Sequence, residues 1–106
     1  MSSDDQPKRW TFLTNHTQVL LCIARDPEAR LRDVAAAVGI TERAAQRIVS
    51  DLVEDGFVTR ERKGRRNHYA VNPEAHMRHP AQLDYQIGEL LQLLELHTAD
   101  GARPTD

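Results

Sequence analysis

The sequence contains a single cysteine, Cys22, and this scarcity narrows the chemistry open to the chain. One thiol cannot form a disulfide within the chain or supply the several sulfur ligands of a cysteine-based zinc site. The sequence also has no apolar run near the roughly 18 residues that a membrane-spanning helix needs. A charged stretch followed by an apolar segment, the mark of an exported protein, is missing too. We therefore expect a cytoplasmic protein with no membrane partner.

Catalytic patterns are missing as well. The sequence shows no paired carboxylates, no nucleophile with a base, and no glycine-rich phosphate loop in a catalytic context. We therefore expect no enzyme activity and no cofactor. Aromatic residues form only 5% of the chain, whereas 40% of its residues are hydrophobic, which suits one small aliphatic core within 106 residues.

The net charge of −2 hides an uneven distribution of charge. Residues 59–66 carry five cations and one acid, whereas residues 81–106 carry five acids and one cation, Arg103. A basic patch is the electrostatic footprint of nucleic-acid binding, and an acidic end can face away from the nucleic acid. The charge pattern therefore favours a nucleic-acid partner, provided that the cations share one surface.

Hydrophobic periodicity predicts three helices in the first half of the chain, at residues 15–25, 32–38 and 42–55. Thr14 or Asn15 is expected to cap the first helix, and Leu31 fits a very short strand before the second. Upstream, Trp10, Phe12 and Leu13 form an apolar cluster that we expect to pack against a later helix.

The second and third helices are joined by a tight turn, Gly39-Ile40-Thr41. Gly39 can adopt a left-handed backbone at the helix end, Ile40 fills the angle between the helices, and Thr41 caps the next helix. A tight turn demands close helix approach, which small residues permit, and these are Ala35, Ala36 and Ala45. The arrangement is typical of a helix-turn-helix.

The third helix has an apolar face and a polar face. The apolar face consists of Ala45, Ile48, Val49 and Leu52. Arginine can bind guanine through two hydrogen bonds and glutamine can bind adenine in the same way, so the polar face suits DNA base edges. The alternative is a merely solvated helix face, and Glu42 must either meet a base donor or turn aside from phosphates. The candidate base contacts are Thr41, Arg43, Gln46, Arg47 and Ser50.

A basic hairpin follows the third helix. Residues 57–62 and 67–71 alternate as two strands, with Tyr69 and Val71 on one face, and Lys63-Gly64 is expected to form the turn. Such a ribbon can reach phosphates or enter a minor groove, although a charged hairpin can also serve solubility alone. His68 fits a phosphate contact and a structural position equally well. The candidate contacts of the hairpin are Arg60, Arg62, Lys63, Gly64, Arg65, Arg66 and His68.

Several stretches of the sequence resemble the winged helix-turn-helix transcription regulators of bacteria, and the MarR and ArsR families are the nearest. The stretches are LRDVA at 31–35, VGITERAAQ at 38–46, LVEDGFV at 52–58 and GRRNHY at 64–69, within a matching region of about residues 14–72. The resemblance implies an α+β, mostly helical fold, with a winged helix-turn-helix domain at residues 10–73, residues 41–55 as recognition helix and residues 60–69 as wing.

Two features of these families are not carried over to this chain. ArsR metal sensors usually have a paired-cysteine motif, which is missing here. MarR proteins have further helices at both ends that build a ligand pocket in a dimer, and we expect this chain to be too short for them. Any small-molecule effector therefore stays unknown.

A last helix is predicted at residues 81–97. Apolar residues with heptad spacing on this helix predict two-fold dimerisation, although the same stripe could cap the monomer core. Leu93 and Leu96 make the helix apolar on more than one side, which favours the dimer. The candidate interface residues are Leu83, Ile87, Leu90, Leu91 and Leu94. The remaining segments are expected to be a linker within 74–97 and flexible tails at 1–9 and 98–106.

The pattern as a whole predicts a transcription regulator, most simply a repressor, that binds double-stranded DNA at a pseudo-palindromic operator and joins the nucleoid when bound. Two alternatives stay open. The winged fold could be a protein-interaction module for an acidic partner. His76 and His79 could instead hold a sensed metal together with His97, although scattered histidines are more often surface or capping residues, and we assign no metal site.

Overall fold

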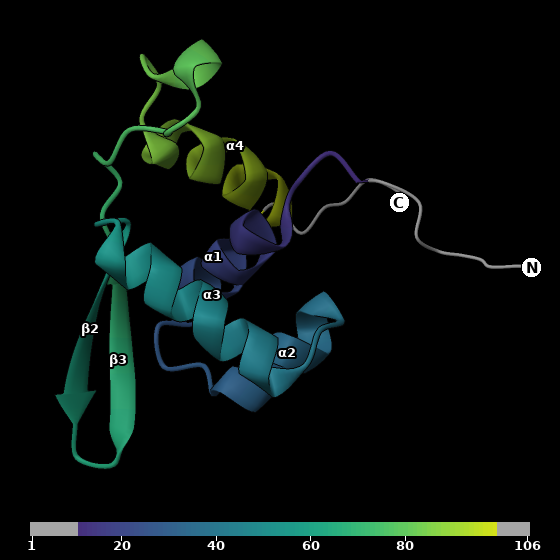
Figure 1. Ribbon diagram of the computed structural model, residues 1–106, viewed down its shortest axis with the longest axis vertical. Coiled ribbons are helices and arrows are strands. Elements are labelled where there is room, and N and C mark those ends of the chain that lie inside the picture. The colour runs from purple at the N-terminus through teal and green to yellow at the C-terminus, as the bar shows by residue number, and fades with distance from the viewer. Residues whose placement is uncertain (1–10, 100–106) are drawn as a thin grey trace, which may run out of the picture.

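The computed structural model describes the backbone of residues 11–99 and the side chains of residues 11–94. Its elements, in chain order, are α1 (Asn15–Arg25), α2 (Leu31–Val38), α3 (Glu42–Glu54), β2 (Val58–Lys63), β3 (Arg66–Val71), the short 3₁₀ helix η2 (Pro80–Gln82) and α4 (Ile87–Ala99). Helix α1 contacts the other three α-helices and β3, and the hairpin projects beyond the helical body (Figure 1). The expected mixed, mostly helical fold with a wing is confirmed.

Helix α1 begins as its sequence predicts. The Thr14 side chain accepts a hydrogen bond of 3.2 Å from the backbone N–H of Thr17, which satisfies one of the free amides at the helix start. The buried residues of α1 are Val19, Leu20, Leu21 and Ile23. Together with the apolar face of α3 they form the centre of the hydrophobic core, and Cys22 packs partly buried against it.

The turn between α2 and α3 has the predicted geometry. Gly39 adopts a left-handed backbone with φ of 86°, and its N–H donates to the carbonyl oxygen of Ala35. The Thr41 hydroxyl oxygen then accepts from the backbone N–H of Ala44 over 3.0 Å and caps α3. Ala35 and Ala45 are buried between the helices, but Ala36 is exposed, so the expectation that it eases helix approach is wrong.

The wing is an antiparallel pair of strands in which Lys63 pairs with Arg66. The two residues of its turn are therefore Gly64 and Arg65, one position later than the sequence predicts. Gly64 has a φ of 64°, the positive value that the favoured two-residue hairpin turns require at this position. Tyr69, from the inner face of β3, is only 3% exposed and joins the core as expected.

The short strand expected at Leu31 does not form. Leu31 is instead the first residue of α2. The segment before it contacts β3 through a backbone hydrogen bond of 2.8 Å, from the N–H of Tyr69 to the carbonyl oxygen of Pro27. The expected apolar cluster upstream of α1 is also only partly correct. Leu13 packs against the core, but Phe12 is 91% exposed, and Trp10 lies outside the described residues.

The last helix begins at Ile87, not at residue 81. The backbone N–H of Met77 bonds to the carbonyl oxygen of Tyr85 over 3.0 Å, and His76 bridges Gln86, so the chain before α4 is closed into a loop that contains η2. The helix continues to Ala99, so the predicted tail cannot begin at 98. The tail segments 1–9 and 100–106 lie outside the described residues.

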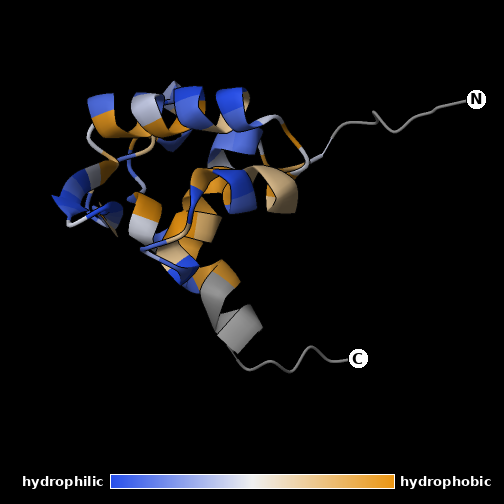
Figure 2. Ribbon diagram, turned by 90° about the horizontal axis from the view of Figure 1, so that it is seen from below, coloured by the Kyte–Doolittle hydropathy of each residue, from blue (hydrophilic) through white to orange (hydrophobic). Residues whose placement is uncertain are grey.

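Hydrophilic residues cover the outer faces of the helices and hairpin, and hydrophobic residues gather between the helices (Figure 2). Among the described residues, every buried side chain belongs to the hydrophobic core. In the same part of the chain no helix is both long and apolar enough to cross a membrane.

Candidate nucleic-acid interface

The outer face of α3 presents a continuous polar stripe. Its inward residues are almost fully buried, with exposed fractions from 0% to 7%, and this packing fixes the rotation of the helix about its axis. The residues that the structure leaves exposed on the opposite face are Arg43, Gln46, Arg47 and Ser50. The structure therefore brings these four predicted base contacts onto one solvent-facing surface. Thr41 is also exposed, but its hydroxyl oxygen already serves as the helix cap.

Neither Arg43 nor Arg47 makes an ion pair with another described residue. The contacts between acidic and basic side chains in this part of the chain involve His16, His68 and Arg78 instead. Since a guanidinium group has five N–H donors, two unpaired arginines on one helix face leave a dense array of donors open to a partner.

The five cations of the wing do not all lie on one face of the hairpin. Strand alternation puts Arg60 and Arg62 on the same face as Tyr69, whereas Lys63 and Arg66 point to the other. Arg65 lies in the turn between them. The charge is gathered only at the tip, where both faces of a narrow ribbon can meet the walls of one groove.

Contacts at the wing distinguish anchored cations from free ones. A side-chain nitrogen of Arg66, Nη1, donates to the backbone carbonyl oxygen of Glu28 over 3.3 Å, and Nε of Arg62 donates to that of Gly64 over 3.4 Å. The side chains of Arg60, Lys63 and Arg65 have no hydrogen bond or ion pair with any described residue. The free cations are therefore Arg65 in the turn and Arg60 and Lys63 on β2.

His68 is turned toward the body of the protein. Its Nδ1 lies 3.5 Å from the Oε2 atom of Glu28, and this nitrogen is buried without a hydrogen bond. The side chain is about one third exposed, at 34%. This geometry favours a structural role for His68, at the contact between β3 and the loop that joins α1 to α2.

A groove of about 570 Å³ lies between the wing and the start of α2, and we call it the arginine groove. Its charged lining residues are Glu28, Arg30, Arg32, Glu42, Arg65 and Arg66. Glu42, the first residue of α3, thus lines this groove. Sequence reasoning did not find Arg30 and Arg32, because only the fold brings them beside a hairpin more than 30 residues away.

The residues predicted to form the dimer interface have three different environments. Ile87 and Leu91 are only 8% and 6% exposed and belong to the chain's own core, so they do not form an outward seam. Leu90 and Leu94 are partly buried against that core. Leu83 is 52% exposed but lies in the loop before α4, because the helix starts later than predicted. Among the described side chains of α4, which end at residue 94, Leu93 is the outward apolar one, with an exposed fraction of 67%.

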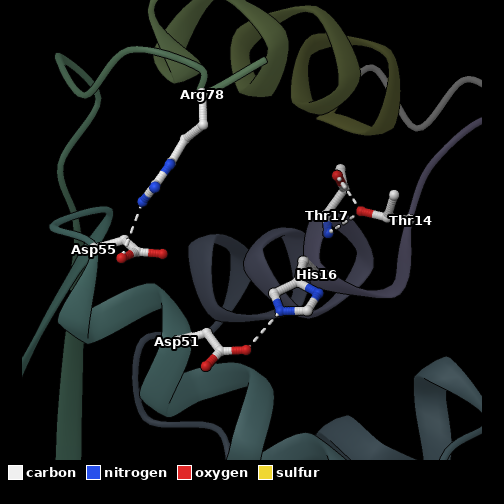
Figure 3. Close-up of polar contacts among 6 residues, drawn as sticks. All are labelled: Thr14, His16, Thr17, Asp51, Asp55 and Arg78. Carbon is white, nitrogen blue, oxygen red and sulfur yellow. Dashed lines mark hydrogen bonds and ion pairs between the residues drawn. The ribbon is translucent and has the colours of Figure 1, made fainter.

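A second cleft, of about 490 Å³, lies among α1, the end of α3 and the loop before α4. Figure 3 shows the polar contacts at its border: Nε2 of His16 lies 2.9 Å from Oδ2 of Asp51, and Nη1 of Arg78 lies 3.0 Å from Oδ1 of Asp55. Its apolar lining residues are Leu20, Leu52, Phe57, Met77, Ile87 and Leu90.

The histidines of the linker bond to the backbone of their own loop. Nδ1 of His76 is 2.6 Å from the carbonyl oxygen of Leu83, and Nδ1 of His79 accepts from the N–H of Ala81 over 3.0 Å. The described residues contain no cluster of three or more side chains suited to hold a metal ion, and the side chain of His97 lies outside them. Burial raises the pKa of the Cys22 thiol, and the nearby charge of Arg25 lowers it by a smaller amount. A raised pKa disfavours the reactive thiolate.

The arrangement has a clear counterpart among solved structures. The PcaV transcriptional regulator from Streptomyces coelicolor, solved in complex with its natural ligand, is similar with a TM-score of 0.52 and 23% sequence identity. The match covers 79% of this chain and 61% of that chain, so this chain spans less than two thirds of the regulator's length. At this identity the similarity shows the shared fold.

Comparison with curated proteins finds no match. The model of the MarR family, in contrast, matches residues 11–66, a region that runs from just before α1 to the first residue of β3 and contains α3 and the five cations of the wing. This match covers more than half of the chain. The chain therefore belongs to the MarR family of winged-helix transcription regulators.

Proposed function

We propose that this chain binds double-stranded DNA in a sequence-specific manner, with α3 in the major groove and the wing on the adjacent minor groove or backbone. The observation that carries the proposal is the exposed stripe of Arg43, Gln46 and Arg47, whose orientation is fixed by an almost fully buried opposite face. A major groove about 12 Å wide admits an α-helix, and arginine and glutamine can read base edges there through paired hydrogen bonds.

The wing supplies contacts of a different kind. Arg65 lies in the two-residue turn and its side chain has no partner among the described residues. A cation at the tip of a ribbon is attracted by the negative potential of a narrow minor groove. Contacts of this type increase affinity for most sequences, whereas base contacts from α3 provide the sequence preference.

The proposal extends to a homodimer. Leu93 is exposed on α4, Leu83 is exposed on the preceding loop, and Leu90 and Leu94 are only partly buried. A two-fold axis near this surface would place two copies of α3 on successive major grooves, roughly 34 Å apart, on a pseudo-palindromic operator. Such a dimer would act in the cytoplasm, most simply as a repressor that occupies a promoter.

The proposal is tested by gel shift on genomic DNA fragments over a range of salt concentrations. We expect binding that weakens with salt and is lost in the variant Arg65→Ala, Arg66→Ala. Arg25→Ala is a matched control, because Arg25 lies in the last turn of α1, outside both α3 and the wing. If the wild-type protein binds no fragment even at low salt, the proposal is wrong and a protein-interaction module is favoured instead.

The cleft bordered by His16 and Arg78 supports a second function, the binding of a small effector. Its volume of about 490 Å³ falls in the range of roughly 300–1,000 Å³ that is usual for ligand pockets, and such pockets are mainly apolar with a few polar groups. The PcaV regulator was solved with its natural ligand. We propose that a small amphipathic molecule occupies this cleft here. Extraction of the purified protein followed by mass spectrometry tests this, and Leu90→Trp, which fills the cleft, should abolish retention.

A further inference from the structure

We propose that the arginine groove binds one sugar–phosphate strand of DNA, and that Arg30 and Arg32 contact the phosphates of this strand. Both side chains line the groove together with Arg65 and Arg66 of the wing. They come from the start of α2, the helix that crosses the backbone in helix-turn-helix proteins, but neither is among the contacts predicted from the sequence. The inference rests on the proposed function and adds a third contact surface to it.

The position of the groove follows from the geometry of the duplex. The groove is lined on one side by Glu42, the first residue of α3, and on the other by the tip residue Arg65. One sugar–phosphate strand always separates a major groove from the adjacent minor groove. A protein that places α3 in the former and the wing in the latter must therefore straddle that strand. The surface between the two elements is the arginine groove.

The charge of the groove suits a phosphate strand. Arg30 and Arg32 are exposed, and neither is in an ion pair with another described residue. Arg30 is the N-cap residue of α2, and its side chain, which has only hydrogen-bond donors, makes no capping bond. Four arginines against two glutamates leave the lining net positive.

The two acids have separate explanations. The Glu28 carboxylate lies beside His68, 3.5 Å from its Nδ1 atom, and its backbone carbonyl accepts from Arg66. Glu42 lies in the first turn of α3, where a negative charge is favourable to the helix dipole. Both acids therefore have structural roles, and the four arginines outnumber them in the lining.

The experiment measures the salt dependence of binding to a fluorescently labelled duplex of arbitrary sequence, because phosphate contacts do not require the operator. The test variant is Arg30→Gln, Arg32→Gln, which keeps much of the side-chain length and removes both charges. Log affinity falls with log salt, and each lost phosphate contact reduces the steepness of this fall by about 0.9. We therefore expect a slope that is less steep by about 1.8 in the double variant. Arg25→Gln, in the last turn of α1 and outside the lining of the groove, should leave the slope unchanged.

A second measurement distinguishes phosphate contact from an indirect effect on the fold. Neutral methylphosphonates are introduced one position at a time along each strand of a second duplex, whose sequence is selected for tight binding so that the protein has a fixed register. We expect some positions to weaken the wild-type protein but not the double variant, because that variant has already lost the partner of those phosphates. Thermal unfolding of both proteins, followed by circular dichroism, checks that the variant is folded.

The outcomes are distinguishable. If the wild-type protein binds DNA but the double variant keeps the full slope and the full methylphosphonate pattern, the inference is wrong and the proposed function stands. If the wild-type protein binds no DNA at all, both are wrong.

Discussion

The backbone N–H of Gly88 donates a hydrogen bond of 2.9 Å to the carbonyl oxygen of Pro73, so the first turn of α4 lies directly on the chain that leaves the wing. A Cβ atom at position 88 would be only 2.8 Å from both the Cβ and the carbonyl oxygen of Pro73. Only glycine therefore permits this approach, and it sets where α4 lies relative to the DNA-binding elements.

Gly88→Ala should destabilise the protein. In an open helix the same change stabilises by about 1 kcal/mol, because alanine has the higher helix propensity. Here the added methyl group meets backbone and ring atoms, and overpacking of this kind costs about 1–3 kcal/mol. The sign of the change in the free energy of unfolding, measured by urea denaturation, shows whether helix propensity or overpacking dominates. A stabilised variant would show that α4 can move away from Pro73 without cost.

Alanine at Arg43, Gln46 or Arg47 should relax sequence preference. A lost two-point contact to a base costs about 1–3 kcal/mol of discrimination at its position. Selection of bound sequences from random duplexes, followed by sequencing, measures this for each variant. Arg65→Ala in the wing should instead weaken all sequences by a similar factor. A wing variant with changed preference and unchanged affinity would contradict this division of roles.

Leu93→Glu should separate a dimer into monomers that remain folded. The side chain is 67% exposed, so the single chain loses little packing, whereas a charge in a two-fold interface would meet its own copy. Light scattering after size exclusion gives the mass, and circular dichroism reports folding. Ile87→Glu is the contrasting variant, because it buries a charge in the core and should unfold the chain. A Leu93→Glu protein with unchanged dimer mass would exclude this surface as the interface.

Cys22 should react slowly with iodoacetamide in the native protein. Burial raises the pKa of its thiol, which leaves less thiolate near neutral pH than in the unfolded chain. The rate should increase on unfolding in urea and with rising pH. Since Cys22 is the only cysteine, the modified mass reports this site alone. A native rate above the unfolded rate would indicate an activated thiol and contradict this prediction.

Residue periodicity was sufficient to predict the polar stripe of α3, because Ala45 and Val49 are spaced for one buried face and the residues opposite must be exposed. Residue periodicity did not predict the features that depend on tertiary contacts. Leu31 joins α2 rather than a strand, since Pro27 already provides the backbone bond to β3. The heptad spacing around Ile87 is real, but it faces the chain's own core. No local signal links Arg30 to the wing, because their proximity arises only on folding.

The wing is attached to the loop between α1 and α2 at two successive carbonyl groups. That of Pro27 accepts from the backbone of Tyr69, and that of Glu28 accepts from the side chain of Arg66. The hairpin is therefore held against the helical body, and its orientation depends on the position of the end of α1. Rotation of α1 by a few degrees would swing the distant tip through a larger arc than the helix itself, so a small shift inside the body would be magnified at the far end of the ribbon.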